Sequence, residues 1–478
     1  MSFVMADNGD DDNQYRIKEG DYVVLKRGEI FKAVQIQPRK KVIFEKQWIF
    51  LDNAVRQLYS TTFEILSGGN LKPHELKDTA SPLDAVEAGT DNRNIVDDGK
   101  SQKLTRDDIE ALKEKGLKGQ DIIKKLVDNH ATFGDKTEYS QVKYIKKKKK
   151  KYENTVMILK PSCRILAMMY HGREPGKICH LRYDTLAQML TLANIHAGSK
   201  VLVFETCAGL VLGSIMERMG GYGSVIQMYP GGGPVRAGVE NFGFPAHFHD
   251  TLHEFPICHV NALLAGTLDT SAKDPTAENT HEKQLNLAAE KKQNQPEAEE
   301  QGTPEEESMV TNTGDDAGQD VEKTEKDKLK EAKAQVKKLR LEEKQRKLAA
   351  TAALLKGRNA DGLIISSRFH PCPVLLGLLK FLSPSRPFVV YSQYIEPLIE
   401  CFKKLKECGG TVNLRLTDTW LRHYQVLPDR THPLLLMSGG GGYLLSGTTV
   451  ATDHSKPAGS KQAEEPAPKR QKLEDTEG

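Results

Sequence analysis

Near its middle the chain reads Lys200-Val201-Leu202-Val203-Phe204-Glu205-Thr206-Cys207-Ala208-Gly209-Leu210-Val211. This stretch is an apolar run of strand length, a turn that contains glycine, and the start of an apolar segment with helical spacing that extends to residue 219. Residues 224–228 form a second short apolar run. The order of strand, glycine turn, helix and strand predicts a doubly wound α/β sheet.

The α/β pattern resumes after a long polar interruption. Apolar runs of strand length again alternate with segments of helical spacing. The expected elements are strands at 363–365 and 388–391, helices at 374–381 and 395–407, and extended segments near 412–416 and 434–437. The residues after 439 are mostly Gly, Ser, Pro and charged residues, which predicts a tail.

The N-terminal part has a different pattern. Between residues 15 and 65, short apolar runs are separated by turn signals such as Gly20-Asp21 and Arg27-Gly28. Several short strands at close spacing predict a small β-barrel or half-barrel. Further along, Thr105 stands three residues before Asp108, which is typical of a capping box at the start of a helix.

The turn after residue 204 has the position of a nucleotide-binding turn, because ligands of such sheets lie beyond the carboxyl ends of the strands. Nearly the whole chain, from Glu19-Gly20-Asp21-Tyr22-Val23 to Arg422-His423-Tyr424-Gln425-Val426-Leu427-Pro428, resembles the non-catalytic subunits of the eukaryotic tRNA adenine-N1 methyltransferases. The resemblance implies a class I methyltransferase-type, Rossmann-like domain. It also implies a catalytic paralogue that binds S-adenosylmethionine through E-x-G-x-G-x-G at this turn.

The turn of this chain matches that motif only in part. Glu205 and Gly209 agree with it, whereas Cys207 and Val211 stand where the resemblance implies the outer two glycines. Glycine is used where a backbone must approach a ligand closely. We therefore expect the side chains of Cys207 and Val211 to occupy space that the cofactor needs.

Two further positions depart from what the resemblance implies for the catalytic subunit. Gln227 stands where an acidic residue accepts hydrogen bonds from ribose hydroxyls, and an amide loses the charge-assisted bonds. Ser366 stands at the catalytic Asp and Arg368 at the proline two residues on. A serine cannot replace a carboxylate as acid or base without an activating partner. We expect no catalytic residue in this chain and no cofactor bound by it.

The pattern and the resemblance together divide the chain into folded and polar segments. Polar stretches without a period cannot bury a core and are expected to be disordered. The expected divisions are a disordered N-terminus (1–14), a β-barrel-like domain (15–70), a flexible loop (71–103), a helical and Lys-rich connection (104–160), the first part of the methyltransferase-like domain (161–265), a disordered acidic insert (266–320), a charged helix (321–358), the second part of the methyltransferase-like domain (359–438) and a disordered tail (439–478).

Basic residues are concentrated, although the 68 Lys and Arg nearly balance the 65 Asp and Glu. Six adjacent lysines repel one another unless an anion is near, and such blocks suit phosphate backbones. The alternative is a solvated linker. The expected RNA contacts are Lys146, Lys147, Lys148, Lys149, Lys150 and Lys151, and more weakly Arg39, Lys40 and Lys41. A charged helix around residues 337–347 is either a further RNA contact or a solvated helix.

Other signals are weaker. His247, His249, His253 and Cys258-His259 do not have the spacing of a standard zinc site, so we expect no metal. Gly231-Gly232-Gly233 lacks a following Lys-Ser/Thr and predicts a flexible connection instead of a phosphate loop. No apolar run approaches the roughly 20 residues that span a bilayer, so we expect no membrane-spanning segment. The seven cysteines include no CxxC pair, so we expect reduced thiols.

The resemblance implies a function. The chain is expected to join the catalytic subunit in a two-plus-two heterotetramer and to position tRNA for formation of 1-methyladenosine at T-loop position 58, with S-adenosylmethionine on the partner. Pro468-Lys469-Arg470-Gln471-Lys472-Leu473 resembles a nuclear import signal, or is a solvated tail. Whether messenger RNA is also a substrate stays open. The alternatives are an active S-adenosylmethionine-dependent RNA methyltransferase with a divergent pocket, and a scaffold without RNA contact.

Overall fold

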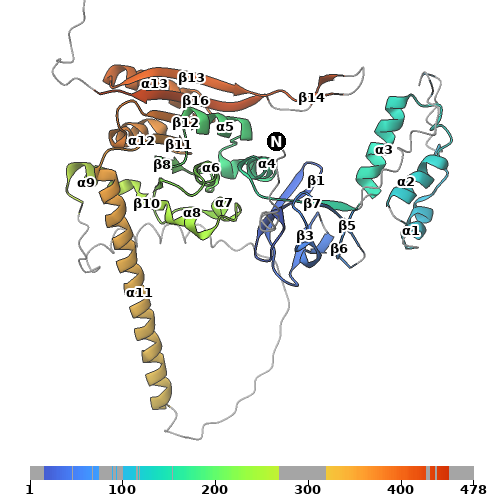
Figure 1. Cartoon of the computed structure of the whole chain (residues 1–478), viewed down its shortest axis with the longest axis horizontal. Coiled ribbons are helices and arrows are strands. Elements are labelled where there is room, and N and C mark those ends of the chain that lie inside the picture. The colour runs from blue at the N-terminus through green and yellow to red at the C-terminus, as the bar shows by residue number, and fades with distance from the viewer. Residues whose placement is uncertain are drawn as a thin grey trace, which may run out of the picture.

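The computed structural model describes residues 15–45, 47–66, 68–74, 89, 93, 101–114, 117, 119–152, 154–268, 319–426, 431–435 and 439–451. Figure 1 shows a large α/β domain, a small β domain beside it and three helices at the far end of the small domain. The disorder predicted for residues 1–14, for most of 266–320 and for the tail from 452 lies outside the described residues. So do most of the flexible loop predicted at 71–103 and the basic motif at 468–473.

The α/β domain is built on one seven-stranded sheet with the order β10-β9-β8-β11-β12-β16-β13. Five neighbouring strands pair in parallel, and β16 pairs antiparallel with both β12 and β13. In chain order this is 3-2-1-4-5-7-6, a Rossmann-like methyltransferase fold. The strands are β8 (Lys200–Glu205), β9 (Ser224–Tyr229), β10 (Leu252–Pro256), β11 (Gly362–Ser366), β12 (Pro387–Ser392), β13 (Thr411–Trp420) and β16 (Gly440–Thr449).

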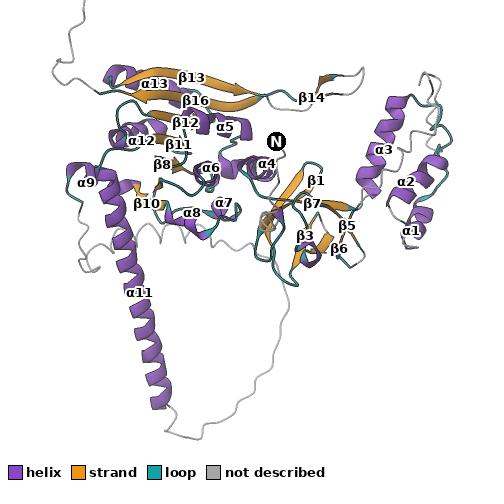
Figure 2. Cartoon of the chain, in the orientation of Figure 1, coloured by secondary structure: helices purple, strands orange, loops and turns teal. Residues whose placement is uncertain are grey.

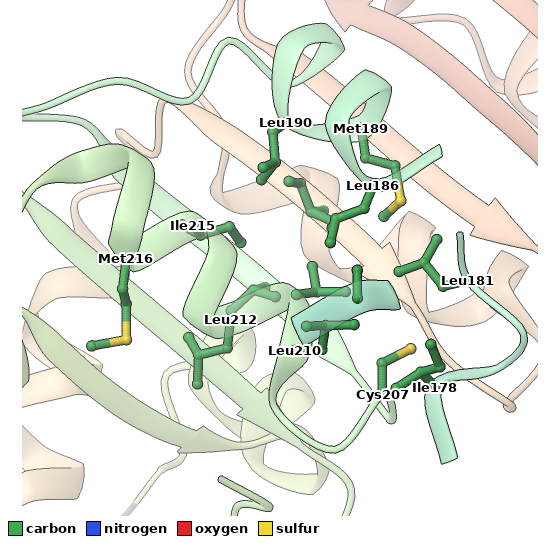
Figure 3. Close-up of a cluster of buried hydrophobic side chains, with 14 of the residues drawn as sticks. Ile178, Leu181, Leu186, Met189, Leu190, Cys207, Leu210, Leu212, Ile215 and Met216 are labelled. Carbon is green, nitrogen blue, oxygen red and sulfur yellow. The ribbon is translucent and has the colours of Figure 1, made fainter. Parts of the chain in front are cut away.

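Helices cover both faces of this sheet because its strands are apolar on both sides. In β8, Val201 and Val203 face one hydrophobic core, and Leu202 and Phe204 face the other. Figure 3 shows part of the first core. The first face is covered by α4 (Cys163–Arg173), α5 (Tyr183–Leu192) and α6 (Leu210–Met219), and the second by α9 (Val260–Ala265), α11 (Gln319–Lys356), α12 (Pro371–Leu378) and α13 (Glu396–Cys408).

The small domain is an antiparallel five-stranded sheet with the order β2-β1-β7-β5-β6, beside a hairpin of β3 and β4. A closed barrel is not confirmed, since β2 and β6 are the edges of this sheet within the described residues. Its central strand β7 comes from the segment predicted to be a connection. The strands are β1 (Tyr22–Arg27), β2 (Ile30–Gln35), β3 (Lys41–Phe44), β4 (Gln47–Phe50), β5 (Thr62–Ile65), β6 (Leu71–Pro73) and β7 (Thr155–Leu159).

The remaining elements are short or lie outside these sheets (Figure 2). In α1 the predicted capping box is formed, because the Asp108 carboxylate accepts the Thr105 backbone N–H at 2.9 Å. The elements are α1 (Arg106–Glu114), α2 (Gly119–Asp128), α3 (Glu138–Tyr152), α7 (Ala237–Glu240), α8 (Ala246–Asp250), β14 (Tyr424–Gln425), β15 (His432–Pro433) and the 3-10 helices η2 (Asp52–Ala54), η3 (Pro175–Ile178), η4 (Ile257–His259) and η5 (Leu379–Phe381).

The prediction of a tail from residue 439 is wrong for its first part. Strand β16 runs from Gly440 to Thr449 between β12 and the edge strand β13, with Leu444 and Leu445 fully buried. Gly447 is required there, because a Cβ atom would lie 2.6 Å from the Phe388 ring. Gly447 therefore allows close packing instead of making the chain flexible. The last strand of this sheet is β16 and not the extended segment expected near 434–437.

Two further observations concern the whole described chain. None of its helices combines the length and the apolar character needed to cross a membrane, as far as the described residues go. All seven cysteines are free.

Candidate functional site

The turn between β8 and α6 begins with a buried acidic side chain. The Glu205 carboxylate accepts the backbone N–H groups of Val211 at 3.2 Å and Leu212 at 2.7 Å, so it caps the first turn of α6. Ala208 and Gly209 both have positive φ, at 57° and 89°. Glu205 and Gly209 therefore maintain the backbone conformation of a glycine-containing turn between a strand and a helix.

The two residues at the outer glycine positions point into the protein. Cys207 and Val211 are fully buried in the core cluster that Figure 3 shows around Leu210 and Leu212. The Cys207 sulfur lies 3.1 Å from the Ser366 hydroxyl oxygen. The side chains of Cys207 and Val211 are therefore part of the core and do not line the outer face of the turn.

The outer face is covered by residues 235–242, which we call the covering segment. The backbone N–H of Gly238 donates to the carbonyl of Ala208 at 2.7 Å. A Cβ atom at Gly209 would lie 3.1 Å from a methyl group of Val239 and 3.2 Å from the Val235 carbonyl oxygen. The backbone approach that a glycine turn normally offers to a ligand is therefore taken by this chain itself.

At the end of β9, Gln227 is engaged in a second internal contact. Arg236, from the covering segment, donates from Nε to the Gln227 side-chain oxygen at 3.0 Å and forms an ion pair with Glu254 at 2.8 Å. Gln227 is only 2 % exposed. The sequence interpretation missed Arg236 and Glu254, because the preceding Gly231–Gly233 run indicated a flexible connection and no motif marks the pair.

The third corner, at the end of β11, is also filled. Ser366 is fully buried against Cys207, and its carbonyl accepts the N–H of Thr206 at 3.0 Å. The Thr206 hydroxyl accepts the backbone N–H of Arg368 at 2.9 Å, and the Arg368 guanidinium donates to the carbonyl of Gly176 in η3. The Ser366 hydroxyl therefore has the Cys207 thiol as its hydrogen-bond partner, and a thiol is a poor base for activating it.

These three corners do not fit S-adenosylmethionine. The glycine turn is covered by backbone. The position where the resemblance implies a ribose contact holds an amide bound to Arg236, and the position where it implies the catalytic carboxylate holds a buried serine. A cofactor at this place would have to displace packed apolar side chains and a partly buried ion pair. The arrangement keeps the fold of a methyltransferase site without its binding surface.

Burial raises the pKa of Glu205 to about 7, above its usual value near 4.5. Because the folded protein then binds this proton more tightly than the unfolded chain, the free energy of unfolding falls as pH rises between these values. The expected loss is about 3 kcal/mol. Glu205→Gln should remove this slope, which urea unfolding at pH 5, 6, 7 and 8 measures. If the free energy of unfolding changes with pH equally in the variant and in the native chain, the prediction is wrong. Glu240→Gln, at an exposed position, serves as the control.

The predicted RNA contacts lie on two elements of the N-terminal region. Lys146 to Lys151 lie on the last turns of α3, where Lys146, Lys147, Lys149 and Lys151 are exposed. Lys148 is half-buried, and its ammonium nitrogen lies 5.0 Å from the centre of the Tyr144 ring. Burial, followed by repulsion from Lys151 and Lys147, lowers the pKa of Lys148. The run is therefore a helix surface of crowded positive charge.

The second basic group lies at the turn before β3. Arg39 has a positive φ of 54°, and its backbone N–H donates to the Asp52 carboxylate at 2.8 Å. Lys40 and Lys41 follow it, and all three side chains are exposed. Figure 1 shows that α3 lies apart from β3, the strand that this turn leads into.

The histidines around residue 250 are spread over several elements. His247 and His249 lie in α8, His253 in β10, and Cys258 and His259 in η4. Within the described part of the chain, no cluster of three or more His, Cys, Asp or Glu side chains is placed to hold a metal ion.

Residues 16–308 match the Gcd10p family. The chain belongs to this family. It is similar to the mouse tRNA (adenine(58)-N(1))-methyltransferase non-catalytic subunit TRM6, with 57% identity over 96% of this chain and 95% of the mouse protein. The corresponding Dictyostelium discoideum subunit is 35% identical over 91% of this chain and 79% of its own length. The resemblance inferred from the sequence is thus confirmed as membership of the Gcd10p family.

Among solved structures, the chain is similar to the tRNA (m1A58) methyltransferase TrmI from Aquifex aeolicus. The identity is 12%, the TM-score is 0.40, and the match covers 91% of this chain and 100% of that chain.

Proposed function

We propose that this chain is the non-catalytic subunit of a tRNA (adenine(58)-N(1))-methyltransferase and positions tRNA for a catalytic partner. The observation that carries the proposal is the filled site of a Gcd10p-family member: the covering segment lies on the glycine turn at Gly209, and Ser366 replaces a carboxylate. Relatives that are 57% and 35% identical to this chain are named non-catalytic subunits of this enzyme.

The proposed division of labour follows from this site. The partner binds S-adenosylmethionine and supplies the catalytic carboxylate, whereas this chain binds no cofactor and contributes surfaces for tRNA. Structured RNA is recognised mainly by its shape and phosphates. The exposed lysines of α3 and the basic turn at Arg39, Lys40 and Lys41 have the charge for such contacts.

We further propose a heterotetramer of two plus two subunits that acts in the nucleus. The nuclear location is supported by the basic cluster at residues 468–473 of the sequence. Messenger RNA that presents a similar loop is a candidate second substrate, because phosphate and shape contacts do not distinguish the two kinds of RNA.

A reconstitution experiment tests this function. The full chain, the purified catalytic subunit and their mixture are each incubated with unmodified tRNA and labelled S-adenosylmethionine, and 1-methyladenosine at position 58 is measured. We expect product with the mixture and none with this chain alone. Methylation by this chain alone, abolished by Ser366→Ala, would show an active enzyme with a divergent pocket and overturn the proposal.

A further inference from the structure

An exposed apolar surface lies on the β3–β4 hairpin of the small domain. The alternation of these strands buries Val42 and Ile49 and turns Ile43 and Trp48 outward. Trp48 is 56 % exposed and Ile43 is 50 % exposed. The two residues are paired directly across the hairpin, so their side chains form one patch. Adjacent exposed apolar side chains that are rimmed by polar residues are candidate interaction sites.

Cations surround this patch. The ammonium nitrogen of Lys41 lies 5.6 Å from the centre of the Trp48 ring, and the Lys32 ammonium donates to the carbonyl of Ile43 at 2.6 Å. Arg39 and Lys40 are exposed in the turn that leads into β3. Lysine is depleted in the centres of protein–protein interfaces. An aromatic ring among lysines instead matches single-stranded nucleic acid, in which each base offers a ring face and each phosphate a negative charge.

The backbone beneath Trp48 is held firmly in place. Ile49 is fully buried in the core of the small domain, and the N–H of Phe50 donates to the carbonyl of Gly69 at 2.9 Å. A Cβ atom at Gly69 would lie 2.5 Å from the carbonyl oxygen of Trp48, so the neighbouring loop packs directly on this strand. A fixed backbone limits the freedom that the Trp48 side chain can lose when a base stacks on its ring.

We propose that Trp48 is a stacking platform for an unpaired nucleobase of the bound RNA, with Lys41 and the turn at Arg39 and Lys40 binding the adjacent phosphates. The inference rests on the proposed tRNA binding. It adds a contact with a base to a surface whose positive charge by itself indicates only contacts with phosphates. Stacking on a ring tolerates any base, so the platform recognises an exposed base and not a particular sequence.

The two tryptophans of the chain, Trp48 and Trp420, make a direct test simple. Trp420→Phe leaves Trp48 as the sole tryptophan of the full-length chain. Its fluorescence is titrated with unmodified tRNA and with a single-stranded RNA of about eight nucleotides. We expect saturable quenching by both RNAs, and the midpoint for tRNA should agree with that from a filter-binding assay.

Substitutions then separate stacking from bulk apolarity. Trp48→Ala and Trp48→Leu should weaken RNA binding by roughly 5- to 150-fold, whereas Trp48→Tyr should recover most of the loss. Thermal unfolding is measured for each variant, and the comparison of Leu with Tyr stays informative if the alanine variant is unstable. Lys41→Gln should lower the slope of log affinity against log salt by about one.

The outcomes are distinct. Unquenched Trp48 at saturating tRNA, or equal affinity of the Leu and Tyr variants, overturns the platform. If tRNA affinity nevertheless falls when the exposed lysines of α3 are neutralised, the proposed function stands without the stacking platform. If no substitution of a basic residue changes tRNA affinity, the platform and the proposed function both fail. A Trp48→Ala chain that no longer co-purifies with the catalytic subunit, with unchanged RNA binding, would identify the patch as a protein contact and also overturn the inference.

Discussion

Replacing Lys146, Lys147, Lys149 and Lys151 together with glutamine should lower the tRNA affinity of the two-subunit complex by roughly 100-fold at physiological salt. These are exposed lysines of the run on α3. Each lysine that binds a phosphate releases counterions, so the slope of log affinity against log salt should also become shallower by about one for each phosphate that is no longer neutralised. Lys148 is left unchanged because it packs on the Tyr144 ring and its replacement would disturb the helix.

Filter binding across a salt series measures this effect. Glutamine favours helices about as well as lysine, so circular dichroism of the variant should be unchanged. The control replaces four other exposed lysines with glutamine, which removes the same charge from η5 and α13: Lys380, Lys403, Lys404 and Lys406. If the α3 variant and the control bind tRNA equally well, α3 is a solvated helix and its role in RNA binding is wrong.

The second large effect concerns stability. Phe242→Ala should lower the free energy of unfolding by about 3–5 kcal/mol, the usual cost of deleting a buried phenylalanine. Phe242 is 7 % exposed, and its ring is stacked on Phe244 with centroids 5.0 Å apart. It anchors the covering segment to α6, where a Cβ atom at Gly213 would lie 2.3 Å from the ring. Urea unfolding of the purified chain measures the change.

A double-mutant cycle makes this test specific to the covering segment. Gly213→Ala alone should cost about 1–3 kcal/mol because its methyl group overlaps the Phe242 ring. In the Phe242→Ala background the same change should be neutral or stabilising, since alanine favours the helix and the ring is gone. Additive effects, or a Phe242→Ala change below about 1 kcal/mol, would mean that the covering segment is not packed on α6 as described.

Sequence alone predicted the parts of the fold that depend on local pattern. The helix at residues 210–219 and the strand before it follow from periodicity, and the capping box at Thr105 and Asp108 follows from side-chain hydrogen bonding. Strand β16 was missed because its glycines resemble a linker, although Gly447 is demanded by the Phe388 ring. Strand β7 was missed because it pairs with β1 and β5, far away in the chain.

The candidate site shows the same division. Cys207, Val211, Gln227 and Ser366 were identified as departures from the motifs that the family resemblance implies for a catalytic subunit. What fills the site could not be predicted, because Arg236 reaches Gln227 and Glu254 only after the chain folds back over the turn. A tertiary contact of this kind leaves no periodic signal in the sequence.

Isothermal titration of the isolated full-length chain with S-adenosylmethionine reports whether this site is closed to a methyl donor. We predict no heat beyond that of dilution at ligand concentrations up to about 1 mM, which is far above a micromolar dissociation constant. Under the same conditions the catalytic subunit, alone or in the complex, should bind. Stoichiometric binding to this chain at micromolar concentration would contradict the account.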